Sequence, residues 1–461
     1  MRYHSTRRGS PAADFAGAAL TGLAPDGGLY IPEEIPRYRD AVKRSLGAMD
    51  FHETAFETIR PYVAGVIPDP ALEDMIRGAF PFTAPLVSAL SPAGADRPVL
   101  ELFHGPTAAF KDFGARFMAR SFSYLRRGEE KTLRILAATS GDTGGAVADG
   151  FYGVQGIAVT VLYPKGRVSE LQEKQIAGLG GNISALAVEG SFDDCQGLVK
   201  AAFRDRALTE RLALSSANSI NIARLIPQAV YYAAAAGRAA AGKRDPDGEA
   251  TPRCQAGSGA PRKTAGGPAS FCVPCGNFGN LTAGLYARAM GAPIADFIAA
   301  TNINKTIPDY LESGEYKTRP SRPTISNAMD VGAPSNFERM SAHWSYEEMR
   351  GMIRGCSVSD DETRGTIAAV RRDFGYYLDP HGAVGWTAAE KLAGAGGRKA
   401  GAEGPWPVVL ATAHPAKFAE TVESLTGPVP VPESIRRAMV RRADAKTIPA
   451  ELDALRDFLL A

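Results

Sequence analysis

Short apolar runs alternate with longer, helix-like segments from residue 99 onward. Runs at 133–138 and 157–163 are apolar and partly β-branched, and a third follows at 183–188. Strands buried in a parallel sheet read as continuous apolar runs separated by helices, so this alternation predicts βαβ units. The expected fold class is α/β with a doubly wound architecture.

Other parts of the chain break this rhythm. Residues 1–95 consist of short polar and proline-containing pieces with helix-like stretches, which predicts an N-terminal lobe. Residues 237–270 are rich in Gly, Ala, Pro and Arg with almost no large apolar side chain, so we expect a disordered surface insertion. We expect residues 96–132 and 217–461 to form a larger α/β domain and residues 133–216 a smaller one.

Length and charge narrow the class of function. The 461 residues are too many for one compact core of typical size. Lysine and arginine total 52 against 50 acidic residues, and this net charge of +2 gives no electrostatic footprint for nucleic acid or anionic membrane. No apolar run reaches the ~18 residues of a membrane span. We expect a cytoplasmic protein, monomeric or homodimeric, that acts on a small molecule; an organelle presequence is the alternative that the basic start leaves open.

Five cysteines are too few, and odd in number, to form a disulfide framework, which suits a reducing compartment. Cys272 and Cys275 form a C-x-x-C, but no second pair of ligands accompanies it. Buried thiols are therefore favoured over a zinc site, and we expect no metal.

Lys111 stands in the run ELFHGPTAAFKDFG, just before a predicted helix at 114–126. A lysine becomes reactive near neutral pH when it is desolvated or bound to a cofactor, and aromatic surroundings provide desolvation. A lysine beside an aspartate is otherwise most often an exposed ion pair. This segment alone leaves both interpretations open.

Two glycine-rich turns follow apolar strands and open helices. Residues 139–145, TSGDTGG, bring backbone N–H groups and hydroxyls to a helix start, which suits a carboxylate or phosphate. Residues 275–280, CGNFGN, do the same, and their glycines let an anion approach the backbone. Either turn could be structural, with Asp142 as a helix cap. Together with Lys111 they predict a cofactor and substrate site.

These motifs carry a resemblance to a known family. The lysine segment resembles the cofactor-attachment signature of the fold type II pyridoxal-phosphate enzymes, the tryptophan synthase β-like group, and its wording FHGPTAAFKDFG is similar to the threonine synthases of bacteria and fungi. Further matches are YHSTR, DGGLYIP, NSINIARLIPQ, TNINK, MDVGAPSNFER, DPHGAVG and ATAHPAKF. They cover most of the chain and imply two doubly wound α/β lobes with an additional N-terminal lobe.

The resemblance also implies roles for residues in these motifs. Lys111 would hold the aldehyde of pyridoxal 5'-phosphate as an aldimine and move protons, and Thr412 would face the pyridine nitrogen. The cofactor phosphate would be bound by Gly276, Asn277, Phe278, Gly279 and Asn280. The substrate would be contacted by Ser140, Gly141, Asp142 and Thr143, with Arg224, Lys305, Asn336 and Arg339 as secondary candidates for charge matching. For the motif histidines we expect packed, hydrogen-bonded rings rather than a role in the chemistry; they are His104, His381 and His414.

The reaction implied is the conversion of O-phospho-L-homoserine and water to L-threonine and phosphate, the last step of threonine biosynthesis. It requires proton removal from Cα and then Cβ, loss of the γ-phosphate and addition of water at Cβ. A phospho-lyase that releases 2-oxobutyrate would use the same lysine and turns. A non-catalytic protein that keeps the fold is a third interpretation, against which the intact motifs argue.

Overall fold

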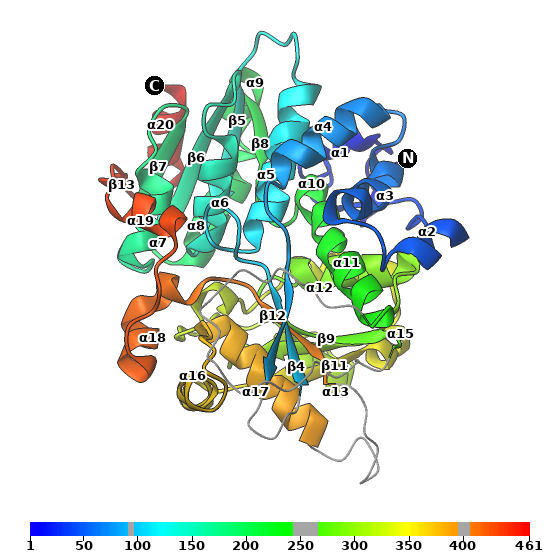
Figure 1. The fold of residues 1–461 in the computed structure, drawn as a ribbon. Helices are drawn as coiled ribbons and strands as arrows, with labels where there is room; N and C mark the ends of the chain where they lie inside the picture. Colours follow the sequence, from blue (N-terminus) through cyan, green and yellow to red (C-terminus); the bar gives the residue numbers. More distant parts are fainter. Residues whose placement is uncertain (91–95, 243–265, 395–405) are drawn as a thin grey trace.

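The computed structural model describes residues 1–90, 96–242, 266–394 and 406–461. Helices surround two mainly parallel sheets, and an N-terminal lobe lies beside them (Figure 1). The α/β fold class is therefore confirmed. Most of the expected insertion at 237–270 lies outside the described residues; the described chain is helical up to Ala240 and resumes as a strand at Ala269.

Six strands of the described chain form the larger sheet, in the order β11-β10-β9-β12-β4-β3. Only the β3–β4 pair is antiparallel. In β9, Phe271 and Val273 pack into one apolar cluster while Cys272 packs into another, so both faces are buried. Burial on both faces explains the continuous apolar runs. The strands are β3 (Leu86–Leu90), β4 (Asp96–Glu101), β9 (Ala269–Pro274), β10 (Ile294–Thr301), β11 (Ile353–Ser357) and β12 (Val408–Ala411).

The smaller sheet contains five strands of the described chain, all parallel, in the order β13-β7-β6-β5-β8. The strands are β5 (Leu133–Ala138), β6 (Ile157–Pro164), β7 (Ile183–Glu189), β8 (Ala213–Ser216) and β13 (Lys446–Pro449). The three apolar runs predicted from the sequence are β5, β6 and β7. Strand β13 differs from expectation, because it pairs here although the larger domain was expected to run from 217 to 461. Only Ile448 of this edge strand is buried, so its sequence gives little strand signal.

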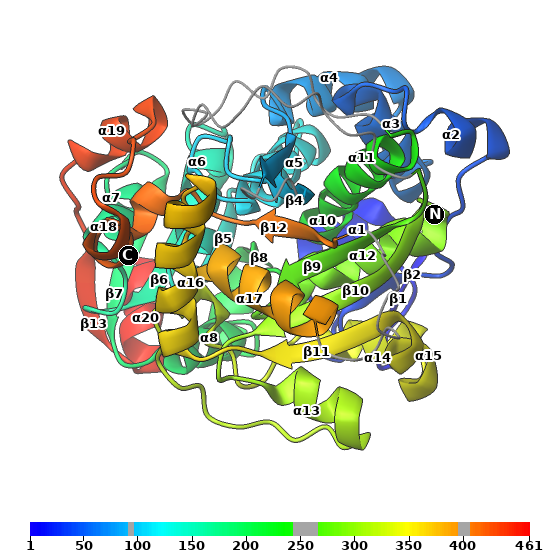
Figure 2. The same ribbon diagram turned by 60° about the horizontal axis from the view of Figure 1, so that its bottom comes forward.

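Helices cover both sheets. Helix α17 packs against one face of the larger sheet and is seen in front of it in Figure 2, while α11 and α12 pack against β9 and β10. No helix in the described part of the chain is long and apolar enough to span a membrane. The helices that follow residue 96 are α5 (Lys111–Leu125), α6 (Asp142–Phe151), α7 (Glu170–Ala177), α8 (Phe192–Ala202), α9 (Arg206–Arg211), α10 (Ile222–Leu225), η1 (Ile226–Gln228), α11 (Ala229–Ala240), α12 (Gly279–Met290), α13 (Thr306–Ser313), η2 (Asn327–Met329), α14 (Phe337–His343), α15 (Tyr346–Met352), α16 (Asp360–Phe374), α17 (Pro380–Gly394), η3 (Pro415–Phe418), α18 (Ala419–Thr426), α19 (Glu433–Met439) and α20 (Leu452–Leu460).

The sequence at 222–236 suggests a single helix, but the structure interrupts it. Helix α10 ends at Leu225, a 3₁₀ turn containing Pro227 follows, and α11 begins at Ala229. Proline lacks the N–H that would continue the helix, and its ring clashes with the preceding turn. The break leaves Arg224 and Gln228 on the wall of a central cavity.

The N-terminal lobe is held together by a short antiparallel strand pair and a cluster of helices. Helix α3 begins with a capping box, in which Asp50 accepts from the Glu53 backbone N–H and Glu53 accepts from the Asp50 backbone N–H. The lobe packs against α5 and α11 (Figure 1). Its elements are β1 (Tyr3–Ser5), α1 (Phe15–Thr21), β2 (Tyr30–Pro32), α2 (Asp40–Ser45), α3 (Phe51–Val63) and α4 (Asp69–Ala79).

Candidate active site

A cavity lies at the carboxyl ends of strands from both sheets, where open α/β folds bind ligands. Ala138 and Ser216 line it at the ends of β5 and β8, and Pro274 and Thr412 line it at the ends of β9 and β12. Its empty volume is about 1250 Å³, including the open mouth. The residues predicted from the sequence that line it are Lys111, Ser140, Asp142, Thr143, Arg224, Gly276, Asn277, Phe278, Gly279, Asn280 and Thr412.

Lys111 is the first residue of α5 and is partly buried on the cavity wall. Burial, together with the positive charges of Arg224 and Lys417, lowers the pKa of Lys111 to about 8, against the opposing pull of Asp142. The neighbouring Asp112 does not form the surface ion pair that the sequence left open. It is buried and accepts hydrogen bonds from the Thr107 N–H (2.9 Å) and hydroxyl (2.6 Å).

Asp142 forms a buried ion pair with Lys417, with 2.8 Å between Oδ1 and Nζ. The same oxygen accepts a hydrogen bond from Gln172 Nε2 at 3.1 Å, and Lys417 also donates to the Thr107 carbonyl at 2.9 Å. Burial alone would raise the pKa of Asp142, but Lys417, Lys111 and other positive charge hold it well below its usual range. The cavity thus contains a permanent negative charge between lysines.

The turn before α6 is organised by Thr139, not by Asp142 as a cap. The Thr139 hydroxyl accepts from the N–H groups of Gly141 (2.9 Å) and Gly144 (2.8 Å), and Asp142 is already the first residue of the helix. Gly141 has φ 139°, and a Cβ there would lie 2.4 Å from the Gln172 side chain. Gly141 shapes this turn and is not among the residues that line the cavity.

The second turn, 275–280, presents backbone and amide groups to the cavity. Phe278 adopts a left-handed conformation with φ 60°, and α12 begins at Gly279, so its first N–H groups have no helical acceptor. A Cβ on Gly276 would lie 2.7 Å from the Ala328 carbonyl oxygen. Asn280 Oδ1 accepts from two tyrosine hydroxyls, whereas its buried Nδ2 has no partner among the described residues. The turn is thus a neutral anion cradle.

Arg224 is a buried cation on the cavity wall. Its Nη1 donates to the Ala217 carbonyl at 2.7 Å, and its Nε is buried without a partner in the described part of the chain. Burial lowers the pKa of its guanidinium to about 10, so it stays charged near neutral pH. A charged donor with an unused N–H is suited to an anionic ligand group.

Three residues expected to match substrate charge are not among the cavity-lining residues. Lys305 is half exposed and pairs with Asp309 at 3.2 Å, the structural alternative for a surface lysine. Asn336 and Arg339 are fully buried behind the 275–280 turn and bind backbone carbonyls. A direct substrate contact by these three is therefore not supported.

Two further residues lie at or beside the cavity: Lys417, which the sequence did not indicate as a site residue, and His381, for which only a packed ring was expected. Lys417 is fully buried beside Asp142, and the only signal was its place in the motif ATAHPAKF. His381 lines the cavity, and its Nδ1 lies 2.5 Å from Asp379. Its Nε2 is buried and has no partner among the residues described. His414 fits the packed-ring expectation better, since burial lowers its pKa to about 4 and its Nδ1 accepts from the Ala416 N–H.

The C-x-x-C pair consists of two buried thiols. Cys272 donates to the Gly385 carbonyl and Cys275 to the Val273 carbonyl, and burial raises the pKa of both thiols. Within the described ranges, no group of three or more His, Cys, Asp or Glu side chains is arranged to hold a metal.

Comparison with known proteins places this site in a family. The model "Threonine synthase N terminus" matches residues 2–80, "Pyridoxal-phosphate dependent enzyme" matches 99–403, and "Threonine synthase, C-terminal" matches 382–459. The threonine synthase of Haemophilus influenzae is 40% identical, over 94% of each chain. The chain belongs to the threonine synthase family. The crystal structure of threonine synthase from Escherichia coli superimposes with a TM-score of 0.86 at 36% identity, covering 100% of this chain and 99% of that one.

The family is pyridoxal-phosphate dependent, and the structure fits that cofactor. The pyridoxal-phosphate-bound threonine synthase from Brucella melitensis has a TM-score of 0.83 at 36% identity, over 100% of this chain and 98% of that one. In this chain, a glycine turn with no room for a Cβ at Gly276 adjoins the unpartnered Asn280 Nδ2 and the start of α12. Lys111 lines the same cavity. The turn is thus suited to the phosphate of the cofactor, and the Lys111 amine is suited to its aldehyde.

Proposed function

We propose that this chain converts O-phospho-L-homoserine and water to L-threonine and phosphate, the last step of threonine biosynthesis. The observation that carries the proposal is that Lys111, the 275–280 turn and Thr412 all line one cavity in a member of this family. Pyridoxal 5'-phosphate would supply the electron sink for proton removal at Cα and Cβ. The chain's own residues would bind the cofactor and the substrate and move the protons.

Lys111 would bind the cofactor aldehyde through Nζ and, once displaced by the substrate amine, move protons at that atom. A pKa near 8 leaves part of the Lys111 population neutral near neutral pH, whereas an ordinary lysine is almost wholly protonated there. A neutral amine is required both to attack an aldehyde and to accept a proton.

The 275–280 turn would hold the cofactor phosphate through Gly276, Asn277, Phe278, Gly279 and Asn280. Support comes from the free N–H groups at the start of α12 and from the amide of Asn280. Thr412 would face the pyridine nitrogen. A neutral hydroxyl at that position, unlike a carboxylate, does not stabilise a protonated ring.

The substrate would lie against the turn before α6 and Arg224. Ser140 and Thr143 line the cavity and offer hydroxyls, and Arg224 offers a buried positive charge to a substrate carboxylate or phosphate. Asp142 forms an ion pair with Lys417, so its negative charge is already matched within the chain beside the substrate. Gly141 would act by shaping the turn.

We also propose the partner class, the location and the domain division of the protein. The balanced charge supports a small-molecule substrate rather than nucleic acid. We propose action in the cytoplasm, as a monomer or homodimer, and a division into a large domain, a small domain and an N-terminal lobe with β13 assigned to the small one.

The test is a reaction of purified protein with O-phospho-L-homoserine in which phosphate, threonine and 2-oxobutyrate are followed together. We expect phosphate and threonine in equal amounts. Release of phosphate with mainly 2-oxobutyrate would mean a phospho-lyase. Absence of the cofactor absorbance band of roughly 410–430 nm in the purified protein would mean a non-catalytic relative.

A further inference from the structure

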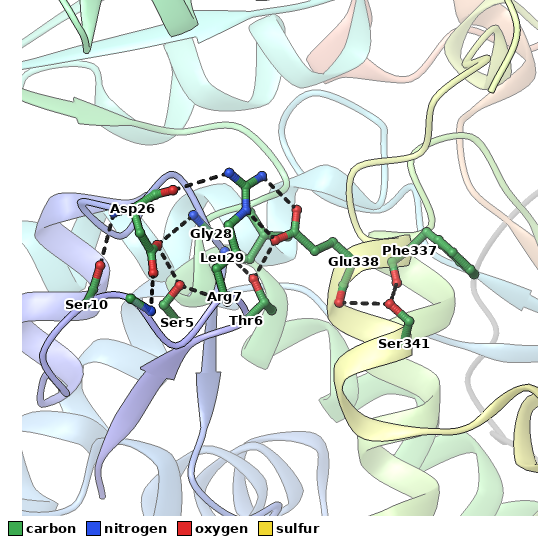
Figure 3. Close-up of polar contacts among 11 residues, drawn as sticks. Ser5, Thr6, Arg7, Ser10, Asp26, Gly28, Leu29, Phe337, Glu338 and Ser341 are labelled. Carbon is green, nitrogen blue, oxygen red and sulfur yellow. Dashed lines mark hydrogen bonds and ion pairs between the residues drawn. The ribbon is translucent and has the colours of Figure 1, made fainter. Parts of the chain in front are cut away.

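Three motifs far apart in the sequence meet at a place that the proposed chemistry does not use. YHSTR supplies β1 and the residues after it, DGGLYIP supplies β2, and SNFER supplies the first residues of α14. Figure 3 shows Thr6 and Arg7 reaching from the N-terminal lobe to Glu338 at the start of α14. Each motif therefore brings polar groups to one contact between the lobe and α14.

The outer part of this contact is an ion pair reinforced by hydrogen bonds. Glu338 accepts from the Thr6 hydroxyl at 2.7 Å and from Arg7 Nε at 3.0 Å. Arg7 Nη1 donates to the Asp26 carbonyl at 3.2 Å, and the Asp26 carboxylate accepts from the Ser5 hydroxyl at 2.7 Å (Figure 3). The Thr6 hydroxyl also accepts from the Leu29 N–H at 2.9 Å, so Thr6 and Arg7 connect the segments around β1 and β2 to α14.

The inner part is built on Arg339, which is fully buried. Its guanidinium donates to the Tyr30 carbonyl in β2 at 3.1 and 3.2 Å, to the Ile220 carbonyl at 2.7 Å and to Asn336 Oδ1 at 2.5 Å. No ion pair between Arg339 and a carboxylate occurs in the described part of the chain. Burial lowers the pKa of this guanidinium. Burying a charge without an ion-pair partner is unfavourable, so we interpret Arg339 as a residue that fixes the backbone segments whose carbonyls it binds.

Asn336 connects Arg339 to the 275–280 turn through hydrogen bonds. With its oxygen taken by Arg339, its Nδ2 donates to the Asn277 carbonyl at 3.1 Å. The Ser335 N–H also donates to Asn277, at its side-chain Oδ1, over 2.5 Å. Asn277 is thus held on both its backbone and its side chain by residues just before α14.

We propose that Arg339 and Asn336 are positioning residues through which the N-terminal strand pair sets the geometry, and so the affinity, of the 275–280 turn for the cofactor phosphate. The proposal rests on the proposed function in assigning that turn to the phosphate. It gives a role to two residues that the sequence suggested as substrate contacts, and it makes the first 30 residues part of the cofactor site.

The test compares full-length variants by cofactor titration of the apoprotein, the ³¹P chemical shift of the bound phosphate, and the melting temperature. Asn336→Ala removes the donor to Asn277, and we expect the Kd for pyridoxal phosphate to rise by about tenfold with a shifted ³¹P resonance, as for loss of one buried hydrogen bond. The double variant T6V/R7A loosens only the exposed part, and we expect a rise of about threefold. The matched control is Arg39→Ala, which breaks another Arg–Glu pair of the lobe, and it should leave both cofactor readouts unchanged.

Wild-type Kd and ³¹P shift in folded Asn336→Ala would overturn the proposal, even with a lower melting temperature. If that variant does not fold, T6V/R7A decides, because Arg7 is exposed and Thr6 is only partly buried, so their replacement does not threaten the core. Cofactor readouts in T6V/R7A that match the Arg39→Ala control would overturn the proposal. A wild-type protein that takes up no pyridoxal phosphate would instead sink the proposed function.

Discussion

The two sides of the cavity handle negative charge differently. On one side, Lys111, Lys417 and Asp142 form a buried cluster of charged groups, in which the two lysines lower the pKa of Asp142 and Asp142 opposes the lowering of the pKa of Lys111. On the other, the 275–280 turn offers backbone N–H groups and the neutral amide of Asn280. Moving protons requires groups that titrate, whereas holding a phosphate in one place does not. Changes on the charged side should alter pH behaviour and chemistry, and changes on the neutral side should alter affinity alone.

The largest effect is expected for Lys111→Ala. Turnover should fall by about 10³-fold or more, because the residue is both the attachment point and the proton carrier. The absorbance band near roughly 410–430 nm should disappear. The control is Lys165→Ala, which removes an exposed lysine paired with Glu189 and should keep the band. Retention of the band by Lys111→Ala would remove this residue from the chemistry.

Lys417→Met tests whether the charged side depends on its buried ion pair. Removing one partner leaves Asp142 buried without its ion-pair partner, and we expect the free energy of unfolding to fall by about 3 kcal/mol. Urea denaturation followed by circular dichroism measures this. Lys165→Met, at an exposed pair, should cost less than about 1 kcal/mol. Equal losses in the two variants would contradict the assignment of Lys417 to the cluster.

Gly276→Ala tests the neutral side. The added Cβ would lie 2.7 Å from the Ala328 carbonyl, so the turn must shift, and we expect the Kd for pyridoxal phosphate to rise by about 30-fold, or roughly 2 kcal/mol. Gly365→Ala in α16, where a Cβ meets open space, is the control and should bind the cofactor normally. An unchanged Kd in Gly276→Ala would mean that the turn does not hold the phosphate.

The pH dependence of cofactor uptake separates the two sides directly. Burial lowers the pKa of Lys111 to about 8, and only the neutral amine attacks the aldehyde. The rate of uptake by the apoprotein should therefore rise about tenfold per pH unit below pH 8 and level off above it. Gly276→Ala should weaken binding without moving this midpoint. A rate that keeps rising towards pH 10 would show an ordinary lysine.

The fold was largely predictable because buried parallel strands have a simple pattern. The runs that became β5, β6 and β7 are apolar on both faces. Strand β13 was not predictable, since it is a short edge strand with a single buried residue, and its partner β7 lies more than 250 residues earlier in the chain. The break after α10 does carry a local signal, because Pro227 cannot continue the helix.

The candidate site was also predictable only in part. Turns that follow strands carry local signals, so glycines and polar residues alone indicate the 139–145 and 275–280 turns. The partners of those turns were not, because ion pairs such as Lys417 with Asp142 join residues from distant motifs. The contacts of Arg339 were not predictable for a related reason. Its residue type suggests that it binds an anion, and only the fold shows its donors directed at carbonyl oxygens.

The smallest effect is expected for Lys305→Ala, which tests whether a lysine outside the two sides of the cavity binds the substrate. Lys305 is half exposed, pairs with Asp309 and is absent from the residues that line the cavity, so KM for O-phospho-L-homoserine should change by less than about twofold. Ser140→Ala provides the comparison, because loss of a hydrogen bond to a charged substrate group should raise KM by about tenfold. Initial rates measured as phosphate release give both values. A tenfold rise in KM for Lys305→Ala would place that lysine on the substrate's path and add a charged group that the cavity wall does not include.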